Sequence, residues 1–140
     1  MIAIDTNVLL RYLLQDDPKQ SKKAVEVING GQCVLVTDVV LTEAIWTLTG
    51  KRYSADKETV CRVVRGLLGD NDFHFEDIQV VWTALCAFEE SVSVRGKALD
   101  FADSLIVAKA HVVLREYGES VPMVLSFDKA VHQLEGAGGL

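Results

Sequence analysis

The sequence is poor in the residues that mark small stapled domains. Its 140 residues include only two prolines and three cysteines, and the cysteines, at positions 33, 61 and 86, include no C-x-x-C pair. An odd number of widely spaced cysteines favours neither a disulfide framework nor a zinc site. We therefore expect three inert thiols, and we expect the scattered histidines at 74, 111 and 132 to be structural or surface residues.

Long apolar runs are also missing. No run approaches the ~18 to 20 residues that span a bilayer. The first residues include neither a basic stretch nor a cleavable apolar segment, so an export signal is not expected. The sequence thus predicts no membrane association and a cytoplasmic location.

The chain has no excess of positive charge, since its formal net charge is −6. This argues against a protein that coats nucleic acid through bulk positive charge. A nuclease is not excluded, because a site built from carboxylates is itself negative and bound metal offsets that charge. The chain is 49% apolar and 24% charged, with no repeat or linker, which predicts one globular domain over residues 1–140.

Short apolar strands alternate with amphipathic helices along the chain. This order predicts an α/β fold, a three-layer α/β/α sandwich with a central parallel sheet. The expected strands are 2–4, "QCVLVT", the weak "FHFED" and "VPMVLSF"; the expected helices are 6–14, 18–30, 38–50, 54–70, 77–91, 100–118 and "DKAVHQL" at 128–134, with "EGAGGL" as a tail.

Helix starts are marked by capping residues. Asp17 before Pro18 is a plausible N-cap, because a proline is favoured in the first turn of a helix. Asp38 is the expected cap of the third helix, and Ser54 and Asp56 are candidates for the fourth.

Acidic residues occupy positions with little structural need for a carboxylate. Asp5 and Asp128 each follow an apolar strand, and the carboxyl ends of parallel strands share one edge, where ligands bind. Glu43 and Asp103 each interrupt an otherwise apolar stretch of helix. Asp100 lies three residues before Asp103, so both can share a helix face.

Each acidic residue has an ordinary alternative role. Asp5, Asp128 and Asp100 could cap helices, and Glu43 could be an exposed helix residue. Asp103 is harder to dismiss, because apolar residues flank it on both sides. Neighbouring carboxylates repel one another and are costly to bury unless a cation neutralises them.

Carboxylates without a nearby histidine or thiolate are hard oxygen ligands. They suit Mg²⁺ or Mn²⁺ and fit metal-assisted hydrolysis of a phosphodiester. Thr6 and Asn7 open a helix beside Asp5, where they could support the carboxylates or a phosphate, and Ser126 could support Asp128. Simple capping is the alternative for these three residues.

Four segments together resemble a known family: "IDTNVLLRYL", "TEAIWTL", "DFADSLIVAKA" and "LSFDKAVHQL". In this order and spacing they are similar to PIN-domain ribonucleases, and specifically to the VapC toxins of type II toxin–antitoxin systems. The resemblance covers essentially the whole chain. It implies a parallel sheet flanked by helices and an endoribonuclease site that uses Mg²⁺ or Mn²⁺.

The resemblance also implies roles for individual residues. The four acidic positions of the family fall on Asp5, Glu43, Asp103 and Asp128, and Asp100 matches an additional acidic position. The family's Thr or Ser before the last aspartate corresponds to Ser126. The implied partners are a second copy of the chain, a small DNA-binding antitoxin encoded separately, and a structured RNA such as tRNA or rRNA.

RNA recognition also requires cations. Arg11, Arg95 and Lys97 are the favoured candidates because the sequence places them near the acidic edge. The further candidates are "SKK" at 21–23, "GKR" at 50–52, and Arg62 with Arg65. The alternative for each is a solvated helix face or loop.

Two other functions fit parts of the pattern. An aspartate-nucleophile phosphatase also has an aspartate after its first strand, but it generally needs a second aspartate where this chain has Asn7. A non-catalytic PIN-like module that binds RNA or protein is the other alternative, and the complete acidic set argues against it.

Overall fold

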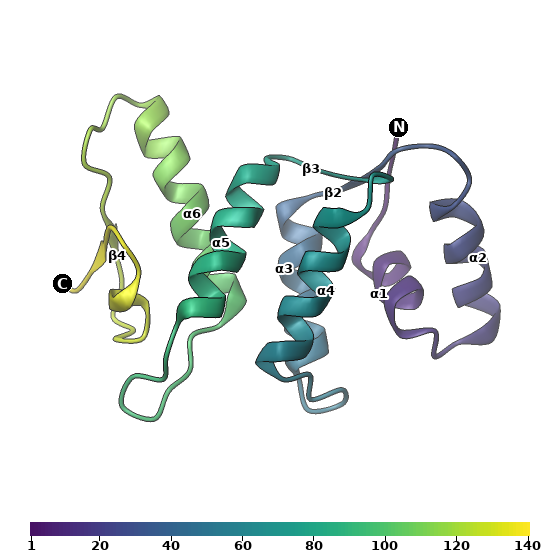
Figure 1. Cartoon of the computed structure of the whole chain (residues 1–140), viewed down its shortest axis with the longest axis horizontal. Coiled ribbons are helices and arrows are strands. Elements are labelled where there is room, and N and C mark those ends of the chain that lie inside the picture. The colour runs from purple at the N-terminus through teal and green to yellow at the C-terminus, as the bar shows by residue number, and fades with distance from the viewer. The chain divides into compact units, whose positions relative to one another are not determined.

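The computed structural model describes all 140 residues and divides the chain into two compact units, Met1–Ile78 and Gln79–Leu140 (Figure 1). Each unit is described by itself. The single domain expected over residues 1–140 stays a prediction.

The first unit is built on a parallel sheet in the order β1-β2-β3 (Figure 1). Val34 of the central strand lies opposite Ile2 on one side and Phe73 on the other. Val34 and Val36 are fully buried, which explains why this strand is a continuous apolar run. The strands are β1 (Ile2–Ala3), β2 (Val34–Val36) and β3 (Phe73–Phe75).

Four helices complete the first unit: α1 (Thr6–Leu14), α2 (Pro18–Ile28), α3 (Asp38–Thr49) and α4 (Lys57–Gly69). Helix α1 packs against α2 and α3, and α3 packs against α4. Asp17 caps α2 and Asp56 caps α4, which confirms both predictions.

The predicted cap of α3 was wrong by one residue. Thr37, in an extended conformation, accepts the hydrogen bond from the Val40 N–H, and Asp38 is the first helical residue. The β2 strand ends at Val36, so the backbone is still extended at Thr37, as an N-cap requires.

The second unit contains α5 (Ile78–Glu90), which starts at the boundary, α6 (Phe101–Glu116), and the parallel pair β4 (Val124–Leu125) and β5 (Ala137–Gly138). Helix α6 contacts β4. All strand pairs of both units are parallel, which confirms the predicted α/β class.

The C-terminal segment differs from the prediction. The expected helix over 128–134 is only a short 3-10 helix, η1 (Val131–Gln133), and the expected tail contains β5. Glycine permits this course, because Gly136 has φ +69° and an added Cβ there would lie 2.5 Å from the His111 imidazole.

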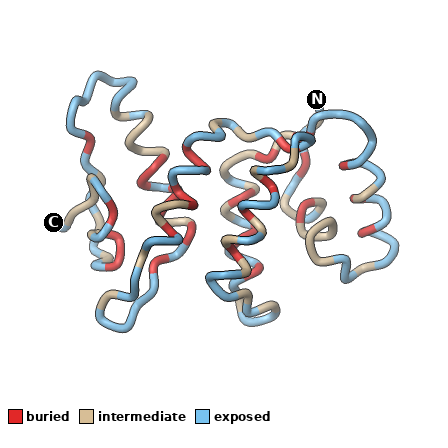
Figure 2. The backbone as a smooth tube through the Cα atoms, viewed as in Figure 1, coloured by how far each residue is buried: buried red, intermediate tan, exposed pale blue.

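Buried residues recur along one side of the helices in each unit (Figure 2). In the second unit, an apolar cluster joins Leu99 and Val107 to η1 through Ala130, Val131 and Leu134. This packing fixes the segment after Asp128 against the start of α6.

Two further expectations concern the whole chain. The three cysteines are free thiols, with Cys33 exposed and Cys61 and Cys86 half-buried, so no disulfide forms. None of the helices combines the length and apolar character needed to cross a bilayer.

Candidate functional site

Asp5 is both a helix cap and a potential ligand. It lies directly after the buried Ile4, and its Oδ1 accepts a hydrogen bond of 2.9 Å from the Val8 N–H at the start of α1. Its Oδ2 has no hydrogen-bond partner. The two roles weighed for Asp5 are therefore compatible, because capping uses one oxygen and leaves the other available.

The Glu43 side chain contacts the first residue of the same helix, α1. Its Oε2 accepts a hydrogen bond of 2.6 Å from the Thr6 hydroxyl, across thirty-seven positions in the chain. Thr6 directly follows Asp5, so Glu43 is bonded to the residue next to Asp5 in the chain. Asn7 comes next, and its exposed amide has no hydrogen-bond partner.

Asp100 and Asp103 lie at the start of α6. Asp100 is the N-cap residue, which confirms the capping role favoured for it, and its N–H donates to Asp103 Oδ2 over 3.4 Å. Asp103 is half-buried. Burial raises the pKa of Asp103, and the neighbouring carboxylates of Asp100 and Asp128 raise it further.

Asp128 is held on both oxygens. Oδ2 pairs with Lys97 Nζ at 2.6 Å, and Oδ1 accepts a hydrogen bond of 2.9 Å from the Ala130 N–H. Lys97 is the main reason that the pKa of Asp128 is lowered, followed by the Ala130 N–H. The Ser126 hydroxyl accepts a hydrogen bond from the Asp128 N–H, and its role in supporting the Asp128 carboxylate stays a prediction.

Lys97 is presented by a tight turn. Val94 and Lys97 exchange backbone hydrogen bonds of 2.8 and 3.1 Å, and between them Arg95 and Gly96 have φ of +52° and +78°. Positive φ at both central residues is the pattern of a type I′ hairpin turn. The pKa of Lys97 is raised by Asp128 and, more weakly, by Asp103 and Asp100. Lys97 is thus the cation among three carboxylates.

The two arginines expected to bind RNA differ. Arg11 donates to Asp16 Oδ1 at 2.7 Å and to Gln20 Oε1 at 2.9 Å, so its guanidinium ties α1 to the start of α2. Arg95 is exposed in the turn beside Lys97. An RNA contact by Arg11, Arg95 or Lys97 stays a prediction.

Two supporting residues were not identified from the sequence. His132 Nε2 lies 2.7 Å from the Ser126 carbonyl, and so holds the segment that carries Asp128. Gln133 accepts from the Val92 N–H and donates to the Val92 carbonyl, and so anchors the loop that leads to Lys97. Neither contact has a local sequence signal, because both join residues whose pairing depends on tertiary structure.

The oxygen donors of both units suit a hard divalent ion. In the second unit, burial and, more weakly, the neighbouring carboxylates raise the pKa of Asp103, and a bound cation would offset both effects. Neither unit by itself arranges three Asp, Glu, His or Cys side chains into a group that could hold a metal ion. The type of donor fits a hard divalent ion, and the set of four carboxylates stays a prediction.

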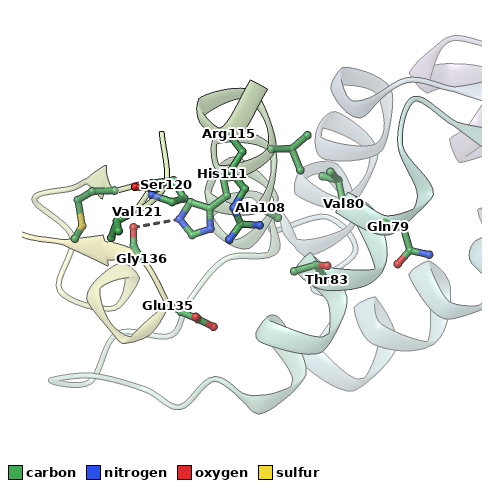
Figure 3. Close-up of a pocket in the computed structure, with 13 residues that line it drawn as sticks. Gln79, Val80, Thr83, Ala108, His111, Arg115, Ser120, Val121, Glu135 and Gly136 are labelled. Carbon is green, nitrogen blue, oxygen red and sulfur yellow. Dashed lines mark hydrogen bonds between the residues drawn. The ribbon is translucent and has the colours of Figure 1, made fainter. Parts of the chain in front are cut away.

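The second unit also contains a cavity of about 710 Å³ (Figure 3). His111 Nε2 donates to the Gly136 carbonyl at its edge, and Arg115 also lines it. Arg115 is about 18 Å further along α6 than Asp103, at 1.5 Å per residue. None of the acidic candidates lines this cavity.

The two units define an α/β protein with parallel strands whose carboxyl ends lead into acidic residues. The family model of the PIN domain matches residues 2–136, and the chain belongs to this family. Helices with parallel strands agree with the predicted α/β/α fold. PIN domains are generally nucleases. No curated protein matches the chain.

Proposed function

We propose that the protein is a metal-dependent endoribonuclease that hydrolyses phosphodiester bonds of RNA. The observation that carries this proposal is the position of the half-buried Asp103 beside two other carboxylates: burial raises the pKa of Asp103, and Asp100 and Asp128 raise it further although Lys97 lies nearby. Such an arrangement is costly without a cation, and pKa values perturbed in this way are common at functional sites.

The proposed ligands are Asp5, Asp103, Glu43 and Asp128, acting directly or through water, with Asp100 as a further contributor. Mg²⁺ or Mn²⁺ supplies, when bound, an activated water and stabilisation of the charge that develops on the phosphate. The choice between these two ions follows from hard oxygen donors and is part of the proposal.

The residues of the chain itself orient the carboxylates before any ligand arrives. The Val8 N–H holds Asp5, the Thr6 hydroxyl holds Glu43, and the Ala130 N–H holds Asp128. Side chains held in this way need little reorganisation during the reaction, which is how preorganised sites lower a barrier.

RNA cleavage by the purified protein tests the proposal. We expect cleavage of tRNA or rRNA with Mg²⁺ or Mn²⁺, loss of cleavage in EDTA, and loss in Asp5→Asn and in Asp103→Asn. Glu119→Gln is the matched control, because Glu119 is an exposed carboxylate outside both acidic groups. Cleavage that survives both aspartate substitutions, or that ignores EDTA, would reject the assignment.

We further propose that this nuclease is a VapC-type toxin that acts in the cytoplasm. In this proposal it forms a homodimer, is neutralised by a small DNA-binding antitoxin, and cuts a structured RNA such as tRNA or rRNA. The support is the full-length match to the PIN domain together with the four quoted segments.

The toxin role has its own tests. Expression of the parent chain should arrest growth, expression of Asp103→Asn should not, and co-expression of a small neighbouring reading frame should restore growth. Light scattering should give twice the mass of one chain. Cleavage in vitro without growth arrest would leave the nuclease intact and remove the toxin assignment.

A further inference from the structure

A second cavity adjoins Asp5 in the first unit. It has a volume of about 510 Å³ and lies between α1 and α2 beside the end of β1. This volume is within the range of small-molecule sites in proteins. Val8, Ala24 and Val27 form an apolar part of its lining. The lining also has five polar side chains, those of Asp5, Asn7, Arg11, Gln20 and Lys23.

Three of the polar side chains of this cavity have groups without a hydrogen-bond partner. The Asn7 amide and the Lys23 ammonium are exposed and have no hydrogen bond or ion pair, and Asp5 Oδ2 has no hydrogen-bond partner. Arg11 also lines the cavity, but Asp16 and Gln20 already engage its guanidinium. The free donors are therefore one ammonium and one amide, on α2 and α1 respectively.

The apolar part provides a surface for a flat ring. Ala24 is buried, Val8 is half-buried and Val27 is 46% exposed, so their aliphatic groups face a ligand without an aromatic stacking partner. Lys23 and Val27 lie four positions apart and share one face of α2. An apolar surface matches the flat face of a base, an amide matches its hydrogen-bonding edge, and a free cation matches a phosphate.

We propose that this cavity binds one unpaired nucleotide of the RNA, next to the phosphate that is cleaved. The base lies on Val8, Ala24 and Val27, the Asn7 amide pairs with an edge of the base, and Lys23 contacts a phosphate. Proteins read RNA mainly through such splayed-out, unstacked bases. This proposal rests on the nuclease function, because Asp5 supplies the link between the cavity and the reaction.

Binding of short single-stranded RNA tests the cavity. Fluorescence anisotropy with the Asp103→Asn protein avoids consumption of the RNA. Adding Lys23→Met should weaken binding about five-fold, the upper range for an exposed ion pair. It should also lower the slope of log affinity against log salt by about 0.7, the loss of one phosphate contact on a single strand.

Lys19→Met is the matched control. Lys19 is an exposed lysine of the same helix, α2, and does not line the cavity, so the change in charge is identical. Lys19→Met should leave affinity within two-fold of the parent. Equal effects of the two substitutions, or no effect of either, would overturn the nucleotide site, and a peptide would then be the better occupant.

Asn7→Ala tests base reading separately from charge. Parent and variant are compared on homopolymers of each of the four bases. We expect the differences in affinity among them to shrink in Asn7→Ala while the salt slope stays the same. Unchanged preferences would contradict the role of Asn7.

Failure of the nuclease function has a different result. If the parent chain cleaves no RNA with Mg²⁺ or Mn²⁺ but Lys23→Met still weakens RNA binding selectively, the cavity assignment stands and the enzyme assignment falls. If the parent cleaves RNA and the two lysine variants behave alike, only the cavity assignment falls.

Discussion

The carboxylates of the two units are held in different ways. In the first unit neutral donors hold them, the Thr6 hydroxyl on Glu43 and the Val8 N–H on Asp5. In the second unit Asp128 is paired with Lys97, and Asp103 is crowded by two other carboxylates. Neutral donors orient a charge without cancelling it, whereas an ammonium cancels it. The carboxylates of the first unit therefore keep their negative charge, whereas in the second unit Lys97 would compete with the proposed divalent ion for Asp128.

The largest expected effect is the loss of cleavage on substitution of Asp103 or Asp5, and the melting temperature distinguishes the two variants. Either Asn substitution should reduce cleavage by at least about a hundred-fold if the carboxylate is a metal ligand. Asp103→Asn should also raise the melting temperature in EDTA, because it removes a half-buried charge that its neighbours repel. Asp5→Asn should leave the melting temperature nearly unchanged, since Asn caps a helix as well as Asp.

Differential scanning calorimetry of the metal-free proteins checks this prediction. A lower melting temperature for Asp103→Asn than for the parent would mean that the acidic group of the second unit is not repulsive. The proposed contrast between the carboxylates of the two units would then be wrong.

Lys97 is expected to compete with the metal. Lys97→Met should raise the Mn²⁺ affinity measured by calorimetry by about ten-fold, or 1.4 kcal/mol, because Asp128 loses its internal cation. Lys129→Met removes the same charge one residue after Asp128, from a side chain without an ion pair, and should change affinity much less. Equal gains in both variants would point to net charge alone.

The Thr6–Glu43 hydrogen bond should have a smaller effect. Thr6→Val keeps the shape of the side chain and removes the donor, so Glu43 loses its orientation. We expect cleavage to fall about ten-fold and the free energy of unfolding to fall by about 1 kcal/mol, the net value of one hydrogen bond. Thr6→Ser should restore activity, and a variant as active as the parent would argue against a positioning role.

The smallest effect is a pH dependence of stability. The pKa of Asp103 is raised in the folded protein, so its ionised form costs stability at neutral pH, and that cost disappears as the pH falls through the raised pKa. The melting-temperature advantage of Asp103→Asn should therefore shrink in acid. Asp128 has the opposite sign, because its pKa is lowered and its contribution to stability is lost as the pH falls through that value. An Asp103→Asn advantage that is constant with pH would contradict this account.

The sequence predicted those features that depend on neighbouring residues. Asp17 and Pro18 define the start of α2, and the apolar run at β2 defines a buried strand, because capping and strand burial leave local patterns. The sequence also indicated Asp5, which follows an apolar strand, and Asp103, which apolar residues flank, with Asp100 three residues earlier; their role as ligands stays a prediction. The Lys97–Asp128 ion pair was not predicted, because it joins residues thirty-one positions apart through a turn.

The C-terminal segment shows the same limit. The residues after Asp128 have helical periodicity, but η1 ends after Gln133 and β5 pairs with β4. A two-residue strand in a glycine-rich stretch has no apolar pattern, and only the pairing partner and the close approach of Gly136 to His111 determine it.

The position of Asp5 at the start of α1 has an evolutionary consequence. Its carboxylate is oriented by a main-chain N–H, which every residue except proline provides at position 8. Mutations in the walls of the adjoining cavity can therefore accumulate without misplacing that acid. If the proposed nucleotide site is correct, related chains could then differ in the RNA they prefer while the orientation of the acid is kept.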